Sequence, residues 1–423
     1  MRILLLSNLY PPYVEGGAEI LAADVATGLE RSGHEVFVLT STPGSQHIQH
    51  EEHIWRTLTL APPAHFDRHL ALYQQLQLPL NYYRRYHNPS NVAELRRVIK
   101  ATQPDVIYIW ELEGLGVTSL LQFLAEAHVP VVFHLNSYWL LYAQSPETEQ
   151  TRLRTKWFKQ RLIGTIPSLP RASYIAISNT VKQHYVSAGF DAQAITVVYN
   201  GLASQFLDQP SSGQRSDAEG CARLLYVGRL RIEKGLLILL EALDILIHEQ
   251  HEPHPFHLMV FGSGDAVYIK EVEAFIRDRH LSDVVTFGGT VSHDDLIKEY
   301  DQASMLIVPS LWQEPFGLVV IEAMARGVPI IASNIGGPAE IITSGANGLL
   351  TGKGDAHALA DAIHELLAHP EEGTRLGQTA RQTVCERFMI EKNIKQVEQY
   401  IQHIVQGENG TTATSSTPSG LQV

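Results

Sequence analysis

Short apolar runs alternate with longer amphipathic segments through most of the second half of the chain. The runs at 223–227, 257–261, 284–287, 305–308 and 329–332 have the length of strands, and helical segments separate them. Strands that alternate with helices in this way are typical of βαβ units, which build a parallel sheet. The pattern therefore predicts an α/β domain in the second half.

The first half repeats this alternation less regularly. Strands are predicted at 2–7, 35–40, 105–109, 129–134, 174–177 and 195–198. Between the first two, apolar residues recur from Ala18 to Leu29 at helical spacing, and Gly33 ends the pattern. Further helices are predicted at 116–127 and from Asn179, whereas residues 45–100 show no clear pattern. The first half is therefore a second α/β domain.

A polar, glycine-bearing stretch, SSGQRSDAEG at 211–220, has the composition of a linker. We predict an N-terminal domain at 1–208, a linker at 209–221 and a C-terminal domain at 222–385. A helix at 386–405 follows. Residues 406–423 have little apolar content to bury and are predicted to form a disordered tail.

Composition narrows the class of protein. The chain has 423 residues, enough for two cores, and only two cysteines, which favours a reducing compartment. It has no long apolar run and no signal-peptide pattern, so we expect a cytoplasmic protein. The net charge is −13, of which −12 lies beyond residue 208. This excess of acidic residues argues against a nucleic-acid partner, whose phosphates require a basic surface.

The richest candidate chemistry lies between Pro309 and Pro329. Glu314 precedes a predicted helix, and Glu322 lies within it. The backbone N–H groups of Phe316, Gly317 and Leu318 would be free at the helix start, where the helix dipole also attracts phosphate. An anion site beside two carboxylates is typical of a nucleotide-sugar site, although two glutamates around a helix are also common on ordinary surfaces.

Two cations precede this stretch on a loop between a strand and a helix. Arg229 and Lys234 stand between Gly228 and Gly235 in an otherwise acidic domain. A guanidinium binds an oxyanion in a fork, and an ammonium adds a point charge. From composition alone, phosphate binding and surface solvation remain equally open.

Three further features lie where ligands bind in such sheets, at the carboxyl ends of strands. Gly16-Gly17 opens the first helix, and Gly262 to Gly264 follows a strand of the second domain. Neither forms a dinucleotide fingerprint, so each is a ligand-facing loop or a plain turn. His134 ends its predicted strand as either a ligand residue or a structural histidine.

Two other patterns each allow both a functional and a purely structural interpretation. Histidines spaced by three occur at 47–53 and 248–257, which suggests a metal, but prolines interrupt the second tract and no typical ligand set is present. Residues 151–163 combine basic and aromatic residues. They form either a surface for anionic lipid or a helix packed on the core with a charged outer face.

Taken in order, these pieces resemble the retaining glycosyltransferases of family 4. The matching motifs are Gly16-Gly17, His134, Asn200-Gly201, Gly228-Arg229, Lys234-Gly235, Gly262 to Gly264, and Glu314 to Pro329. The resemblance covers residues 1–390 and is most specific in the second half. It implies the GT-B fold, in which two Rossmann-like, doubly wound domains face each other across a cleft. The N-terminal domain would then hold the acceptor and the C-terminal domain the donor, and the helix at 386–405 would cross back to the N-terminal domain.

The resemblance also implies roles for single residues. Arg229 and Lys234 would bind the donor diphosphate, and Glu322 would bind the ribose. Glu314 would hold the sugar and phosphate, together with the backbone of Phe316, Gly317 and Leu318. His134 would contact the donor sugar. The remaining expected donor-binding positions are Gly16, Gly17, Asn200, Gly228, Gly262, Gly264 and Val291. Leu135 and Leu202-Ala203 depart from the family pattern on the sugar side, so the donor sugar stays undetermined.

The implied reaction is retaining transfer of a hexose from a UDP- or GDP-sugar to a glycan, a lipid-linked acceptor or a small molecule. Charge develops on the leaving diphosphate, where fixed cations and N–H groups stabilise it. No cofactor and no metal are expected, since the sequence contains no Asp-x-Asp. Two alternatives are a nucleotide-sugar 2-epimerase of the same fold and a non-enzymatic sugar-nucleotide binding protein.

Overall fold

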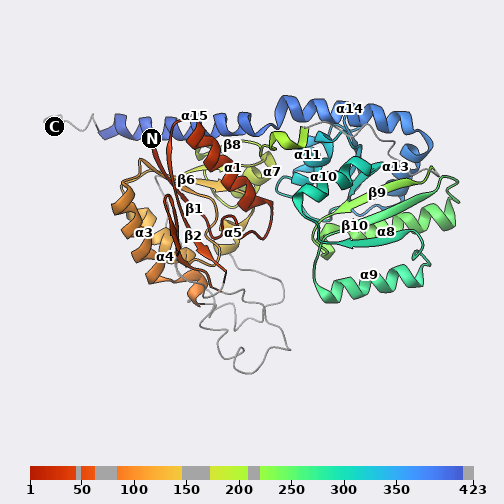
Figure 1. Cartoon of the computed structure of the whole chain (residues 1–423), viewed down its shortest axis with the longest axis horizontal. Helices are drawn as coiled ribbons and strands as arrows, with labels where there is room; N and C mark the ends of the chain where they lie inside the picture. The colour runs from red at the N-terminus through yellow and green to blue at the C-terminus, as the bar shows by residue number, and fades with distance from the viewer. Residues whose placement is uncertain (44–48, 62–82, 145–171, 208–219, 413–423) are drawn as a thin grey trace, which may run out of the picture. The chain divides into compact units, whose positions relative to one another are not determined.

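The computed structural model describes residues 1–43, 49–61, 83–144, 172–207 and 220–412, which form two compact units (Figure 1). The first unit comprises Met1–Ile177, Val181–Val198 and the chain from Asn393 onward. The second comprises Ser178–Thr180 and Tyr199–Lys392. The chain thus passes into the second unit at Tyr199 rather than after residue 208, and most of the predicted linker lies outside the described residues.

The first unit is built on an eight-stranded sheet in the order β3-β4-β2-β1-β5-β6-β7-β8. All neighbours pair in parallel except β3 with β4. The strands are β1 (Arg2–Leu6), β2 (Glu35–Thr42), β3 (Gln49–Glu51), β4 (Ile54–Thr59), β5 (Val106–Ile109), β6 (Val131–Leu135), β7 (Ala172–Ala176) and β8 (Ile195–Val197). The sequence pattern did not predict β3 and β4.

The second unit contains a six-stranded parallel sheet in the order β11-β10-β9-β12-β13-β14. Its strands are β9 (Ala222–Val227), β10 (Phe256–Phe261), β11 (Val285–Gly289), β12 (Met305–Val308), β13 (Ile330–Ser333) and β14 (Leu349–Thr351). The order of the strands reverses between β9 and β12: β10 and β11 follow on one side of β9, and β13 and β14 follow on the other side of β12. At such a reversal point a doubly wound sheet opens a crevice at the carboxyl ends of the two strands. The corresponding point of the first sheet lies between β1 and β5.

Helices and short turns connect the strands. In the first unit they are α1 (Gly17–Arg31), α3 (Pro89–Thr102), α4 (Val117–Glu126), α5 (Trp139–Gln144), η1 (Ala192–Ala194) and α7 (Asn179–Ser187) except for its first two residues. In the second they are η2 (Ser204–Leu207), η3 (Ile232–Lys234), α8 (Leu236–Asp244), η4 (Ile245–Glu249), α9 (Ala266–Asp278), α10 (His293–Gln302), α11 (Leu318–Ala325), α12 (Pro338–Ile341), α13 (Ala356–Ala368) and α14 (Pro370–Arg387).

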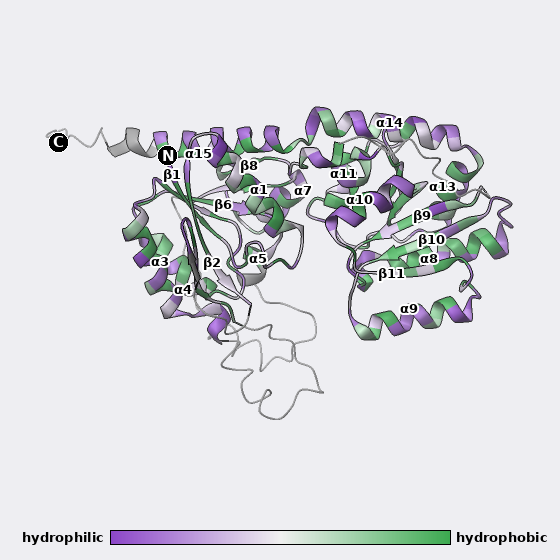
Figure 2. Cartoon of the chain, in the orientation of Figure 1, coloured by the Kyte–Doolittle hydropathy of each residue, from purple (hydrophilic) through white to green (hydrophobic). Residues whose placement is uncertain are grey.

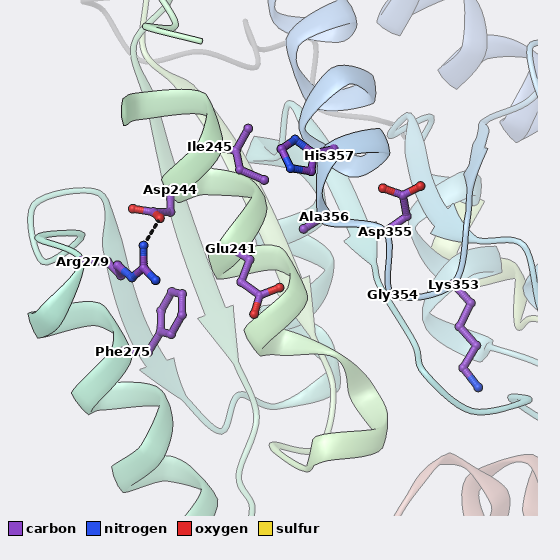
Figure 3. Close-up of a pocket in the computed structure, with 10 residues that line it drawn as sticks. All are labelled: Glu241, Asp244, Ile245, Phe275, Arg279, Lys353, Gly354, Asp355, Ala356 and His357. Atoms are coloured by element: carbon purple, nitrogen blue, oxygen red, sulfur yellow. Dashed lines mark hydrogen bonds and ion pairs between the residues drawn. The ribbon is translucent and has the colours of Figure 1, made fainter. Parts of the chain in front are cut away.

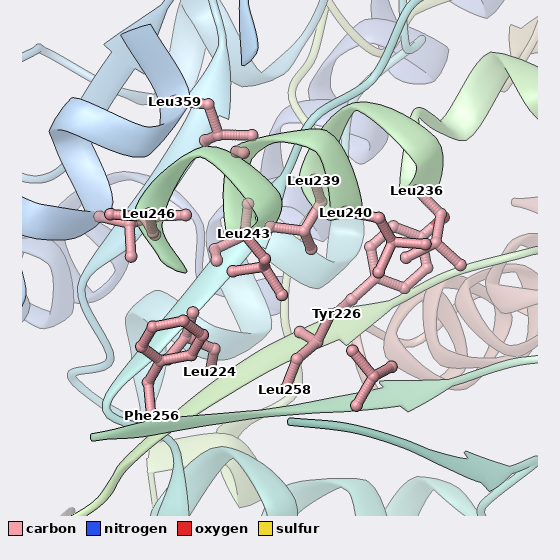
Figure 4. Packing of buried hydrophobic residues seen from close by; sticks show 14 of the residues in the cluster. Leu224, Tyr226, Leu236, Leu239, Leu240, Leu243, Leu246, Phe256, Leu258 and Leu359 are labelled. Carbon is pink, nitrogen blue, oxygen red and sulfur yellow. The ribbon is translucent and has the colours of Figure 1, made fainter. Parts of the chain in front are cut away.

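The core of the second unit shows how the pattern produces the fold. Helix α8 buries leucines at positions 236, 239, 240 and 243, the spacing of one helical face. These side chains cluster with Leu224 of β9 and Leu258 of β10 (Figure 4). Full burial of each leucine contributes about 1.5–3 kcal/mol relative to exposure. The apolar periodicity of α8 therefore fixes which face of the helix covers the sheet.

The last helix, α15 (Ile390–Thr412), belongs to the first unit from Asn393 onward. His34 Nδ1 lies near the N-terminus, and its Nε2 is 2.9 Å from Glu398 Oε1 on α15. Tyr400 donates a hydrogen bond to the carbonyl of Ala194 at 3.3 Å. The helix extends to Thr412, past the end at residue 405 that the sequence predicted for it. Residues 413–423 lie outside the described chain.

Hydropathy follows these elements. Figure 2 shows the strands mainly in the hydrophobic colour, whereas α14 and α15 carry both colours along their length. None of the described helices has the length and apolar character needed to cross a membrane. The basic, aromatic segment 151–163 lies outside the described residues, so the structure does not test its predicted attachment to lipid.

Candidate active site

The reversal point of the second sheet brings together the two loops that the sequence singled out. One loop follows β9 and carries Arg229 and Lys234, and the other follows β12 and leads to Glu314. Leu311 N donates to Glu233 O at 2.8 Å, so the loops are bonded through their backbones. Gly235 has φ +72°, and a Cβ there would lie 1.9 Å from Pro309 O. Only glycine allows this approach.

Lys234 and Glu314 form an ion pair between the two loops. The Lys234 Nζ lies 2.6 Å from Glu314 Oε1, and Ser310 Oγ donates to the same oxygen at 2.7 Å. The Lys234 ammonium also lies 5.4 Å from the centre of the Trp312 ring. Glu314 is only 7% exposed, so the carboxylate is buried but paired. Two of the four predicted catalytic residues, Lys234 and Glu314, thus meet directly.

Arg229, unlike Lys234, does not take part in an ion pair with a described residue. It is exposed, and the structure gives its guanidinium no hydrogen bond or ion pair with any residue that it describes. The loop that carries it is nevertheless well held, because Leu230 N donates to Ser263 O at 2.8 Å. The N–H donors of its guanidinium group are therefore available to bind an anion.

Gly262 and Gly264 support this loop. A Cβ at Gly262 would lie 1.9 Å from Gly228 O, and one at Gly264 would lie 1.9 Å from Leu230 O. The two glycines thus let the loops after β9 and β10 pack backbone to backbone. In the structure the two glycines contact the loop at Gly228–Leu230. The sequence alone did not distinguish this packing role from direct binding of the donor.

The start of α11 provides backbone donors beside Glu314. In the part of the chain that the structure describes, no partner is given for the N–H groups of Phe316, Gly317 and Leu318. The Phe316 side chain is buried against Phe388, with ring centres 5.9 Å apart. Such N–H groups can bind an anionic oxygen at a helix start.

Glu322 lies on the buried face of α11. Tyr300 donates its hydroxyl to Glu322 Oε2 at 2.8 Å, and His293 Nε2 lies 3.5 Å from Oε1. Burial raises the pKa of Tyr300 well above its ordinary value, and the Glu322 carboxylate adds to the shift. Both Glu322 oxygens therefore have protein partners, and a bound ribose would have to share them. Sequence analysis missed Tyr300 and His293, although both lie on α10 directly before β12.

Two further predicted donor positions lie in the second unit. Val291 is partly buried in the connection from β11 to α10, two residues before His293. Asn200 is 4% exposed, and its Oδ1 has no hydrogen-bond partner among the described residues. The strand-like segment after it is bonded to the end of α14, through Leu202 N and Phe388 O at 2.7 Å.

The first unit places Gly16 and Gly17 at the start of α1, beyond the carboxyl end of β1. Gly16 N donates to Glu19 Oε2 at 3.0 Å. Burial raises the pKa of Glu19, whereas the hydrogen bonds from the backbone act in the opposite direction. The Glu19 carboxyl group thus already accepts the hydrogen bond of Gly16 N, one of the N–H groups expected to contact the donor diphosphate.

His134 is buried in this structure, and its predicted contact with the donor sugar stays a prediction. Strand β6 extends one residue past it, and the side chain is 0% exposed. Its ring stacks on Trp110 with centres 3.9 Å apart, and Nδ1 bonds to the Tyr108 hydroxyl. A side chain with no exposed surface cannot touch a sugar in this conformation. In this structure His134 packs in the core against Trp110, because every residue of β6 is buried.

Glu111 is a candidate that sequence analysis missed. It follows β5 at the reversal point of the first sheet, next to Trp110. Burial raises its pKa well above the ordinary value for a carboxyl group, and the nearby charges of Glu113 and Glu19 add to the shift. A signal was present in the sequence, since a carboxylate directly after a buried strand stands at the ligand edge.

The histidines spaced by three do not gather into one cluster in the described part of the chain. Among the described residues no group of three or more His, Cys, Asp or Glu side chains could hold a metal ion. The histidines instead bond to separate partners, for example His248 with Asp244 and His257 with Thr286. His47 lies outside the described residues.

A separate pocket of about 540 Å³ lies between α8, α9 and the start of α13 (Figure 3). Its lining mixes acidic and basic groups, including an ion pair of 2.8 Å between Arg279 Nη1 and Asp244 Oδ2. None of the predicted site residues lines it. Its mixed charge does not match a site for a diphosphate.

Comparison with known families agrees with the geometry of both units. A family model described as "Glycosyltransferase Family 4" matches residues 15–206, and one described as "Glycosyl transferases group 1" matches residues 211–383. Together they span most of the chain. The protein belongs to this family of glycosyltransferases, and its fold is GT-B.

Individual relatives are similar over nearly the whole length. Glycogen synthase of Mycobacterium tuberculosis is 28% identical over 403 residues, covering 92% of this chain and 91% of the relative. The structure of sucrose-phosphate synthase from Thermosynechococcus elongatus matches with a TM-score of 0.71 and 25% identity, covering 96% of this chain and 99% of that one. Anabaena HepE, solved in complex with UDP, matches with a TM-score of 0.67 and 22% identity, covering 95% and 100%.

Proposed function

We propose that this glycosyltransferase transfers a hexose from a UDP- or GDP-sugar with retention of anomeric configuration. The observation that carries the proposal is the arrangement at the reversal point of the second sheet. There Arg229, which has no ion pair with a described residue, and the Lys234–Glu314 pair lie on adjoining loops. Beside them are the N–H groups at the start of α11, for which the described chain offers no partner. This set of donors suits the negative charge of a leaving diphosphate.

The proposed chemistry is electrostatic. As the bond from sugar to diphosphate breaks, negative charge grows on the leaving phosphate and the sugar becomes oxocarbenium-like. Arg229 would bind phosphate oxygens in its fork, and Lys234 has two ammonium hydrogens beyond the one directed to Glu314. Glu314 would hold Lys234 in place and orient the sugar. The acceptor hydroxyl would then attack from the face that the diphosphate leaves, and its proton would pass to the departing phosphate oxygen.

The cations account for the proposed independence from metal. A divalent ion in such reactions neutralises the diphosphate, and here Arg229, Lys234 and the N–H groups would supply that compensation. UDP is present in the structure of the relative HepE, which supports a uridine donor for this chain as one of the two options. The proposed acceptor is a glycan, a lipid-linked molecule or a small molecule. The enzyme would meet it in the cytoplasm, or at the inner face of the membrane if residues 151–163 bind anionic lipid.

The test is a screen of UDP- and GDP-hexoses against candidate acceptors, each with and without EDTA. We expect acceptor-dependent release of UDP or GDP that EDTA does not abolish, and a product whose anomeric NMR coupling matches the donor. Loss of turnover in EDTA, restored by Mg²⁺ or Mn²⁺, would contradict metal independence. An epimerised donor without acceptor would indicate an epimerase, and binding without turnover a non-enzymatic protein.

A further inference from the structure

A three-residue segment, Ser178–Thr180, groups with the second unit although the residues on both sides of it belong to the first. Ser178 is 0% exposed, and its hydroxyl donates to the carbonyl of Pro315 at 2.6 Å. Pro315 is the residue directly after Glu314. The segment therefore bonds to the loop that carries the proposed sugar-binding carboxylate.

One carboxylate holds this segment. Glu340 Oε1 accepts from Thr180 N and Thr180 Oγ1, both at 2.6 Å. Its Oε2 accepts from Asn179 N at 2.8 Å, from Asn179 Nδ2 at 3.1 Å and from the Tyr199 hydroxyl at 3.1 Å. Two of these donors are N–H groups in the first turn of α7, which lack partners within their own helix. A negative charge there also interacts favourably with the helix dipole.

The helix that carries Glu340 contacts the same loop from another direction. Gly337 N, at the start of α12, donates to Glu314 O at 2.7 Å. A Cβ at Gly336 would lie 2.5 Å from Glu314 N, and one at Gly337 would lie 2.1 Å from Phe316 O. The backbone of residues 314–316 is therefore bonded both to Gly337 and to Ser178.

We propose that Glu340 is a positioning residue for Glu314. Its carboxylate joins α12 to Ser178–Thr180, and these two elements together fix the backbone of residues 314–316. That backbone sets the distance from Glu314 to Lys234 and the direction of the N–H groups at the start of α11. Glu340 touches no donor atom in this account and acts only through the loop. The expected effect of Glu340 on kcat rests on the proposed function. Its effect on the order of the 314–316 backbone does not.

Three variants and a control test the proposal. Glu340→Gln keeps the size but replaces one acceptor oxygen with a donor, so at least one of the bonded groups loses its partner. Glu340→Asp keeps the charge at a shorter reach and should restore part of the function. Ser178→Ala removes the single bond to Pro315. Glu371→Gln is the matched control, because Glu371 is also acidic in the first turn of a helix but is well exposed.

The first measurement is hydrogen exchange of residues 311–320, which needs neither substrate nor activity. We expect Glu340→Gln to speed exchange in this segment about tenfold or more, at a Tm near that of the parent, and Ser178→Ala to do so less. Glu371→Gln should leave the segment unchanged. Exchange in 311–320 that is equal in the parent, Glu340→Gln and Ser178→Ala overturns the positioning role.

The second measurement is donor-saturation kinetics. We expect kcat to fall about tenfold in Glu340→Gln, with donor KM changed less than about threefold, because misplacement of a reacting group affects the transition state most. Faster exchange with unchanged kcat would contradict the catalytic consequence. A parent protein that neither binds nor turns over any UDP- or GDP-sugar overturns the proposed function instead, while the exchange result still decides the role of Glu340.

Discussion

The reversal points of the two sheets carry different kinds of site. At that of the second unit, charged side chains from adjoining loops are in direct contact, as in the 2.6 Å pair of Lys234 and Glu314. At that of the first unit, Trp110 covers the predicted ligand residue His134, and the carboxyl groups of Glu19 and Glu111 lie nearby with raised pKa values. The strand order reverses in the same way in both sheets. The second sheet places two cations and a carboxylate at its reversal point, whereas the first places carboxyl groups and a buried histidine there.

This difference follows from where each residue lies. Arg229, Lys234 and Glu314 occupy loops beyond strand ends, where a side chain is free to face a ligand. His134 lies inside β6, whose residues are all buried. A residue in a strand covered on both faces must pack into the core on one side or the other. Donor chemistry should therefore depend on the second unit far more than on His134.

The largest expected effect comes from Glu314→Gln. The amide cannot pair with Lys234 as a carboxylate does, so the ammonium loses its fixed position beside the proposed diphosphate. We expect kcat to fall about a hundredfold or more. Donor-saturation kinetics measure this, with the exposed Glu365→Gln on α13 as control. A Glu314→Gln enzyme within about threefold of the parent would remove Glu314 from the catalytic set.

The second prediction concerns Glu322→Gln. The ribose is chemically the same in ground and transition states, so loss of a contact to it should raise donor KM about tenfold and leave kcat within about threefold. Tyr300→Phe sharpens the result, because it removes only the hydroxyl that donates to Glu322 Oε2. If both variants lower the Tm together while donor KM stays constant, Glu322 is a structural residue.

His134→Phe is expected to act on stability and not on chemistry. Loss of the bond to the Tyr108 hydroxyl leaves a buried polar group without a partner, which costs about 1–3 kcal/mol. We therefore expect a lower Tm with kcat/KM within about threefold of the parent. A fall of kcat/KM of about a hundredfold at constant Tm would return His134 to direct contact with the donor.

The smallest effect is a pH dependence at Glu111. Its pKa is raised in the folded protein, so the folded state holds a proton that the unfolded state releases first as pH rises. This contribution to stability is complete below the unfolded pKa, near 4.3, and is lost as pH rises through the folded value. Glu111→Gln does not titrate, so its Tm should gain on the parent between pH 4.5 and 7.5. Each 1 kcal/mol corresponds to about 2–4 °C.

Glu113→Gln provides an internal check on that result, because the Glu113 carboxylate contributes to the raised pKa of Glu111. It should reduce the pH dependence of the parent in part. A Tm difference between Glu111→Gln and the parent that stays constant over this pH range would show that the Glu111 pKa is not raised.

The sequence by itself determined the two α/β domains and the loop residues of the second one. Apolar runs and helical spacing identify β9, β10, β12, β13 and α8, because burial imposes those periods directly on the chain. The same reasoning missed β14 and β4, which are short or lie in a stretch with no clear period. It also ended α15 near residue 405, because a polar sequence gives no clear signal for the last turn of a helix.

Tertiary structure alone decided which side chains meet and which are covered. No local pattern links Glu340 to Asn179 or Tyr300 to Glu322, since these contacts form only when distant elements pack together. The burial of His134 depends in the same way on Trp110, which directly follows the neighbouring strand β5. Spacing along a chain records the period of an element, whereas contact across a sheet depends on topology and register, which the sequence specifies only through the fold as a whole.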